Sequence, residues 1–186
     1  TNKSPRSTVG TITEIYDFLR LLFSRAADAY SFNTGEKMVS YSDEEIHELI
    51  MNDFKDGKAM ILAPVIKSRK GHYRELFQQI SKQGFIRVRV DGEIKEIERG
   101  MKLDRYKTHD VEIVIDRLKI DASTQSTSRL NESINTAMYH GENVLMIIDK
   151  DSKEIRYFSR NLMCPTSGIS YPNPEPNNFS FNSPKY

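Results

Sequence analysis

The segment from Gln83 to Glu93, Gln-Gly-Phe-Ile-Arg-Val-Arg-Val-Asp-Gly-Glu, constrains the fold more than any other part of the sequence. Gly84 ends a helix, and the apolar residues that follow predict a strand with one face toward a core: Phe85, Ile86, Val88 and Val90. Arg87, Arg89 and Asp91 alternate with them on the opposite face. Asp91-Gly92 predicts a type I′ hairpin turn, because both residues tolerate the positive φ that this turn needs. A rigid strand carrying mixed charge is better suited to recognising a macromolecule than to catalysis.

The composition excludes several classes of protein. The 186 residues fit one domain with ragged ends, and 27 Lys and Arg against 26 Asp and Glu exclude a strongly basic binder of the histone kind. No apolar run approaches the ~20 residues that a bilayer span needs, and no signal-peptide pattern follows Thr1. Cys164 is the only cysteine, which excludes an internal disulfide and favours a reducing, cytoplasmic location. Because the sequence lacks an initiating Met, we expect a piece of a longer protein.

The apolar periodicity predicts an α+β fold, with a mostly antiparallel sheet and helices packed on one face. Ser42 and Glu45 form a capping box at the start of the second helix. The expected helices are Thr8–Ala29, Ser42–Phe54, His72–Gln83 and Ser126–Tyr139. The expected strands are Lys58–Ile66, which is central and covered on both faces, Phe85–Asp91, Glu93–Ile97, Val111–Ile120, Val144–Ile148 and Ile155–Phe158.

The irregular parts of the sequence suggest domain limits. Residues 1–41 form an N-terminal helix and loop, 42–160 form the central domain, and 161–186 form a proline-punctuated tail without periodicity. Lys67–Gly71 is expected to be a basic loop between a strand and a helix. We expect the two ends of the chain to be mobile or held by contacts from elsewhere.

Sites for chemistry are weakly indicated. Ser68-Arg69-Lys70-Gly71 lacks the first glycine and the following hydroxyl of a phosphate-binding loop. The four histidines are far apart in sequence and Cys164 has no companion cysteine, although zinc normally takes four ligands. Cys164 also has no local base to activate it as a nucleophile. The sequence therefore predicts neither an enzyme nor a resident cofactor.

Two charged groups are candidates for contacts with macromolecules. Arg87, Arg89, Asp91 and Glu93 could bind a protein partner through complementary charge. Lys67, Arg69, Lys70 and Arg74 could contact nucleic-acid phosphates. For each group the alternative is a solvated, charged surface.

Several long segments resemble the UvrA family, the DNA-damage-recognition ATPase subunits of the bacterial excinuclease ABC. The resemblance runs in order through essentially the whole chain, over Arg6–Arg25, Met60–Val65, Lys70–Phe77, Gln83–Glu93, His109–Leu118 and Phe179–Pro184. It implies that the central part is the UvrB-binding domain inserted in the first ATPase half. The motifs of the ATPase lie outside this chain, so the resemblance implies ATP binding, DNA contact and self-dimerisation for a longer protein only.

The resemblance also bears on zinc. The family often has Cys-Pro-x-Cys-Gly where this chain has Cys164-Pro-Thr-Ser167-Gly168, and a Cys-Pro-x-His-Gly-like element where Ala29–Gly35 shows none. Because Ser167 replaces the second thiolate, we expect no stoichiometric zinc in this chain. The first helix resembles a segment that packs against absent regions, and its apolar stripe is expected to make the chain self-associate.

Overall fold

The computed structural model describes residues 14–121, 123–171 and 174–179. Its centre is a six-stranded antiparallel sheet in the order β3-β2-β4-β1-β5-β6. The strands are β1 Lys58–Lys70, β2 Arg87–Val90, β3 Glu93–Glu96, β4 Thr108–Lys119, β5 Val144–Asp149 and β6 Ile155–Ser159. The long strands β1 and β4 form the middle of the sheet, which confirms the predicted central position of the strand that begins at Lys58.

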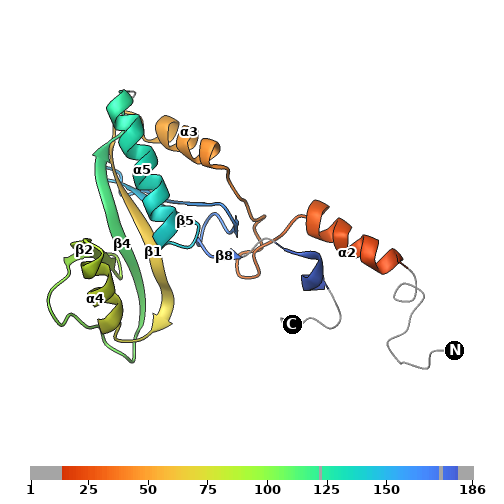
Figure 1. The fold of residues 1–186 in the computed structure, drawn as a ribbon, viewed down its shortest axis with the longest axis horizontal. Helices are drawn as coiled ribbons and strands as arrows, with labels where there is room; N and C mark the ends of the chain where they lie inside the picture. The colour runs from red at the N-terminus through yellow and green to blue at the C-terminus, as the bar shows by residue number, and fades with distance from the viewer. Residues whose placement is uncertain (1–13, 122, 172–173, 180–186) are drawn as a thin grey trace.

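Three helices cover one face of the sheet: α3 (Asp43–Asp53), α4 (Arg74–Lys82) and α5 (Thr124–His140) (Figure 1). Their apolar stripes bury Ile50, Phe77 and Ile134 against alternate strand residues such as Ile61 and Ile113. Such alternation is what a sheet with one covered face requires. The predicted α+β class, with helices on one face, is confirmed.

Local sequence signals fix several of the element ends. Ser42 caps α3 with the predicted capping box, in which the Ser42 hydroxyl accepts from the Glu45 N–H and the Glu45 carboxylate accepts from the Ser42 N–H. The Asp91-Gly92 turn is confirmed, with φ of 50° and 90° at its two residues. The predicted order of helices and strands is also found, with ends that differ by a few residues.

The predicted basic loop is wrong. Lys67 to Lys70 belong to β1, because pairing with β4 continues to Arg69 opposite His109 and Lys70 opposite Thr108. Ser68 takes a positive φ of 47° and the register with β4 shifts three times, so side-chain alternation is lost there. A strand without alternation has no period-two signal in its sequence.

The expectation that β1 is covered on both faces holds at its centre, where Ile61, Leu62 and Ala63 are all fully buried, but the two faces are covered differently. On the face away from the helices, Leu62 is buried by strand neighbours, with Val114 and Met146 beside it and Tyr157 packed against them. Among the described residues, no helix contributes a side chain to this cluster. We call this side of the sheet the open face.

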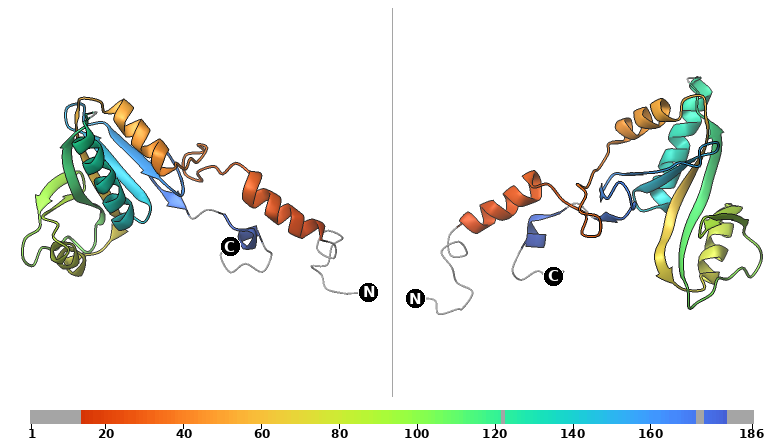
Figure 2. Two further views of the ribbon diagram at one scale, coloured as in Figure 1. Left: turned by 45° about the horizontal axis from the view of Figure 1, so that its top comes forward. Right: turned by 180° about the vertical axis from the view of Figure 1, so that it is seen from behind.

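Two of the remaining elements, α2 and η1, stand away from the sheet (Figures 1 and 2). Helix α2 (Ile15–Ala26) lies beside the 3₁₀ turn η1 (Pro176–Phe179), with Tyr16 donating to the Phe179 carbonyl and the ring of Phe23 6.2 Å from that of Phe179. The helix predicted over Thr8–Ala29 spans Ile15–Ala26, and residues 8–13 of that prediction lie outside the described part. The tail is less irregular than predicted, because β7 (Leu162–Met163) and β8 (Ser170–Tyr171) form a small sheet.

Candidate protein-interaction surface

Cross-strand register places an apolar strip on the open face. Leu62 pairs with Val114 on one side and Met146 on the other, and Met146 pairs with Tyr157. Residues directly opposite in neighbouring strands share a face. The strip therefore crosses four adjacent strands, and its outer members, Met60, Ile148 and Tyr157, remain partly exposed.

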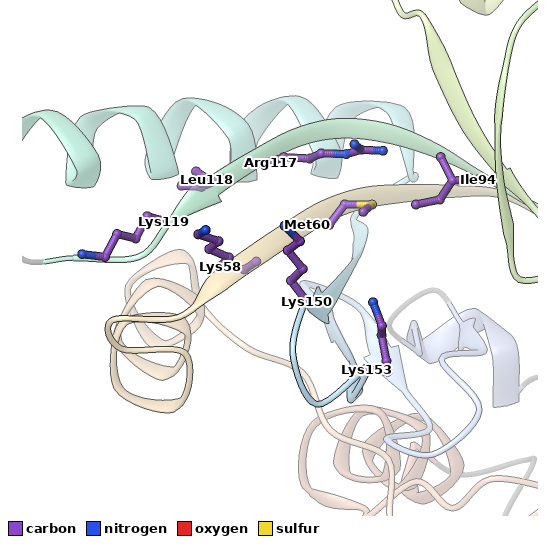
Figure 3. A pocket seen from close by; sticks show the side chains of 9 residues that line it. Lys58, Met60, Ile94, Arg117, Leu118, Lys119, Lys150 and Lys153 are labelled. Carbon is purple, nitrogen blue, oxygen red and sulfur yellow. The ribbon is translucent and has the colours of Figure 1, made fainter.

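A groove of about 420 Å³ runs along one end of this strip. Met60 lies in its middle, with Lys150 and Lys153 from the β5–β6 turn on one side and Arg117 and Ile94 on the other (Figure 3). The described residues that line the groove include five basic side chains and no acidic one: Lys58, Arg117, Lys119, Lys150 and Lys153. An apolar floor with a cationic rim can accept a partner segment that combines apolar and acidic side chains.

Arg87 and Arg89 lie on the open face, as the alternation predicts. Each has an acidic partner: Arg87 Nη2 is 3.0 Å from Glu96 Oε1, and Arg89 Nη1 is 3.3 Å from Glu112 Oε2. The two pairs differ in exposure, because the Arg87 side chain is 43% exposed and that of Glu112 only 2%. Arg87 is therefore accessible to a partner, whereas Arg89 serves chiefly to neutralise a buried carboxylate.

Glu112 is a residue whose role the sequence reading missed. Its alternation with Val111 and Ile113 predicts exposure, yet it is almost fully buried on the open face. Burial raises the pKa of its carboxyl, and the facing Arg89 guanidinium partly offsets that rise. No sequence signal marks this pair, since Arg89 and Glu112 are joined only by the β2–β4 register.

Asp91 has a structural role at the hairpin turn. Its carboxylate contacts His109 Nδ1 at 2.6 Å and accepts the Asp110 N–H at 2.9 Å. Burial opposes ionisation of Asp91, but these two hydrogen bonds outweigh it and lower the pKa of the carboxyl. Glu93 opposes Val90 in register, on the other face from Arg89, and pairs with Lys95. The four predicted partner-binding residues are therefore divided between two faces and a turn.

His109 is a second residue that the sequence reading did not single out. It is buried, and its two ring nitrogens face two acceptors, the Asp91 carboxylate and, at 2.8 Å, the Asp104 carbonyl. Two acceptors require two N–H donors, which only the imidazolium form supplies. The hydrogen bond to Asp91 raises the pKa of His109 accordingly. The charged ring ties the β2–β3 turn to the start of β4.

The four predicted nucleic-acid contacts do not form one cluster. Lys67 lies over the ring of Tyr157, with its Nζ 5.3 Å from the ring centre and 3.4 Å from the hydroxyl. Arg69 and Lys70 are exposed at the far end of β1. Arg74 begins α4 and lines a separate hollow with Phe77 and Met101. Only Arg69 and Lys70 remain together as an exposed basic pair.

The described residues hold no group of three or more His, Cys, Asp or Glu side chains arranged to bind a metal ion. Within the same part of the chain, no helix combines the length and the apolar character that crossing a membrane requires. The open face thus combines an apolar strip with a basic groove on one sheet.

Comparison with known proteins shows which family the chain belongs to. Residues 42–151 match the family described as the UvrA interaction domain. This chain belongs to the UvrA interaction domain family. Relatives named UvrABC system protein A are 41% identical in Methanothermobacter thermautotrophicus and 40% identical in Thermus thermophilus, each over 186 residues. The relative from Lactococcus lactis is 42% identical over 184 residues.

The match to the UvrA interaction domain coincides with the layered part of the fold. It begins at the Ser42 cap of α3 and ends just after β5, so it contains the three covering helices and five of the six sheet strands. The chain as a whole aligns over 99% of its length with these relatives and spans 19% of theirs. The resemblance inferred from the sequence motifs is confirmed.

Proposed function

We propose that this UvrA interaction domain is a docking module that binds UvrB during nucleotide excision repair. The observation that carries the proposal is the open face, with its apolar strip and its basic groove. The name of the relatives, UvrABC system protein A, supports it, because it describes one component of a system with several. The interaction domain acts here by binding, and ATP hydrolysis and lesion recognition belong to the longer protein.

The partner's contact surface follows from the chemistry of the groove. Five cationic side chains around Met60 and Ile94 favour a UvrB segment with carboxylates around an apolar anchor. Arg87 and Arg117 extend the same surface, since both line a second hollow of about 270 Å³ that also includes Val114. Of the predicted partner-binding residues, Arg87 is thus the one that we propose as a direct contact.

Calorimetry with purified UvrB, in the absence of DNA, tests this proposal. Arg87→Glu and Arg117→Glu should each weaken binding by roughly tenfold or more, because each places a like charge against an acidic partner. Lys82→Glu is the matched control, since it makes the same change of charge at an exposed position on α4, in the helix layer. Unchanged affinity in both open-face variants would show that UvrB binds elsewhere.

Direct DNA contact is the second candidate function. The exposed pair Arg69 and Lys70 at the end of β1 favours it. DNA binding by the chain without UvrB, measured over a range of salt concentrations, tests it. Each lost phosphate contact should reduce the salt slope by about 0.9, so Arg69→Gln and Lys70→Gln together should reduce it by about 1.8. An unchanged slope would exclude these residues as phosphate contacts.

A further inference from the structure

Two loops, one before the sheet domain in the sequence and one after it, have side chains at the same spacing. Ser31-x-x-Thr34-Gly35 precedes α3, and Cys164-x-x-Ser167-Gly168 joins β7 to β8. Both glycines have a left-handed φ, 71° at Gly35 and 68° at Gly168. Pairs of side chains separated by two residues are the spacing with which short loops hold zinc.

The backbones of the two loops are also equivalent. In the first, Ser31 N–H donates to the Glu36 carbonyl and Gly35 N–H donates to the Ser31 carbonyl, both at 2.8 Å. In the second, Cys164 N–H donates to Ile169 and Gly168 N–H donates to Cys164, both at 3.0 Å. The same positions are bonded in each loop, so the two form one motif that occurs twice.

Side-chain hydrogen bonds repeat in the same way. In each loop the hydroxyl just before the glycine accepts a hydrogen bond from the backbone N–H two residues later. Glu36 N–H donates to Thr34 Oγ1 at 3.3 Å, and Ile169 N–H donates to Ser167 Oγ at 3.3 Å. In a metal-binding loop these N–H groups would point at ligand thiolates. Here hydroxyl oxygens accept them.

The two loops meet at Cys164, which is fully buried. Its sulfur is 3.3 Å from Thr34 Oγ1, and an antiparallel bridge between Val39 and Met163 holds the loops together. Burial raises the pKa of the thiol, but hydrogen bonds from Ser167, Thr34 and Ser31 outweigh it and lower the pKa. All three hydroxyl positions of the repeated motif therefore converge on the one thiol.

This donor set does not fit zinc. Structural zinc takes four ligands from cysteine sulfur, histidine nitrogen and carboxylate oxygen. Of the converging groups only Cys164 and Glu36 belong to that set, and Glu36 Oε2 accepts from the thiol at 3.4 Å while Oε1 accepts from Thr166 at 2.9 Å. Hydroxyls occupy the other three positions.

We infer that these loops are a paired zinc-knuckle scaffold that works without zinc, in which a thiol–hydroxyl cluster of Ser31, Thr34, Cys164 and Ser167 closes the stem of the domain. The stem is the pair of segments that connect the sheet to α2 and η1 (Figure 2). The cluster joins the incoming segment to the outgoing one, so the attachment of the domain is independent of metal supply and of chelators.

Restoring thiols at the three hydroxyl positions tests the geometry. The chain with Ser31→Cys, Thr34→Cys and Ser167→Cys should bind one Co²⁺, under reducing conditions, with the visible absorption bands of a tetrahedral thiolate site, and Zn²⁺ should displace it. The matched control keeps the first two substitutions and replaces Thr166 instead of Ser167. Its third cysteine is out of register, and it should show no such bands at one equivalent. Failure of the in-register variant to give tetrahedral bands, or equal bands in the control, would overturn the inference.

Measurements on the native chain and on Cys164 alone do not depend on the folding of that variant. The native chain should hold no stoichiometric zinc, and EDTA should leave its melting temperature unchanged; one zinc per chain would overturn the inference. Cys164→Ser should melt at a higher temperature than Cys164→Val, because serine can still bond the surrounding hydroxyls. If Cys164 only fills space, the apolar valine is tolerated better, and that order would overturn the inference.

Discussion

At the scale of single residues, the charged side chains of the open face differ in what they do. Arg89 is 16% exposed and faces the buried Glu112, so its loss leaves a carboxylate without a partner. Arg89→Ala should therefore lower the free energy of unfolding by about 3 kcal/mol at neutral pH. The loss should shrink as the pH falls, because protonation of Glu112, whose pKa burial already raises, removes the unpaired charge. Denaturant unfolding over a range of pH measures both effects.

The double variant Arg89→Leu, Glu112→Leu is the control for this pair. It removes both charges together, so it should be nearer to the native chain in stability than Arg89→Ala is. A double variant less stable than the single one would contradict the pairing. The result also matters for binding studies. A loss of affinity in an Arg89 variant reflects damage to the sheet as well as a lost contact, whereas the more exposed Arg87 can be replaced without leaving a buried carboxylate unpaired.

His109 makes the stability of the β2–β3 turn depend on pH. Its pKa is raised in the folded chain, so its contribution is fully present below the ordinary value of ~6.5 and is lost as the pH rises through the folded value. The groups that face it are the Asp91 carboxylate, the carbonyl and the carboxylate of Asp104 and, opposite it on β1, Arg69. His109→Gln should cost about 1–3 kcal/mol at pH 6 and clearly less at pH 9.

Unfolding of the His109→Gln and native chains at the two pH values checks this prediction. His72→Gln is the control, because it makes the same substitution at an exposed histidine outside this cluster. A constant difference between pH 6 and pH 9 would mean that His109 is not charged in the folded chain. On the acidic side the pKa of Asp91 is lowered, so its contribution is lost only as the pH falls below ~3.9.

The residues that could be predicted are those whose partners are near in sequence. The Asp91-Gly92 turn and the Ser42–Glu45 box each depend on a few consecutive residues, and both are confirmed. His109 and Glu112 take their roles from β2 and the turn that follows it, some twenty residues earlier in the chain. Periodicity alone assigns such residues a face of the strand, and their partners come from the pairing of strands, which no local pattern specifies.

At the scale of elements, the α3 cap offers the simplest test of a local signal. Ser42→Ala removes an acceptor for the Glu45 N–H and should lower the free energy of unfolding by about 1 kcal/mol. Ser42→Asp keeps an acceptor at the same place and should cost much less. Thermal or denaturant unfolding distinguishes them, and an equal loss in both variants would show that the capping bond contributes nothing.

The ends of elements were harder to predict than their existence. The strand β1 continues through four basic or polar residues because β4 keeps pairing with it, and the left-handed Ser68 is bonded to Asp110 at 2.6 Å. A run of exposed Lys and Arg is typical of a loop, so the sequence predicts one. The candidate site changes with this correction, since Lys67 becomes part of the open face and Arg74 does not.

At the scale of the whole molecule, α2 and η1 stand outside the layered domain (Figure 1). Helix α2 has no buried residue, and its large apolar side chains are 43–66% exposed: Ile15, Phe18, Leu19, Leu21, Leu22 and Phe23. Contiguous apolar surface of this kind favours association. The apolar stripe could be predicted from the sequence, whereas its pairing with η1 joins segments more than 150 residues apart and could not.

We therefore predict that the chain self-associates through α2. Sedimentation at increasing concentration should show a shift from monomer toward dimer, because pairing two such helices removes their apolar side chains from water. The double variant Phe18→Gln, Leu22→Gln should remain monomeric at these concentrations, because it removes apolar surface from α2. Both side chains are more than half exposed and neither contacts the sheet core, so the fold should be kept. Arg25→Gln is the control, because it changes an exposed residue of the same helix to a residue of similar helix propensity without removing apolar surface. A chain that remains monomeric at every concentration, or variants that associate as strongly as the native chain, would show that α2 has no part in association.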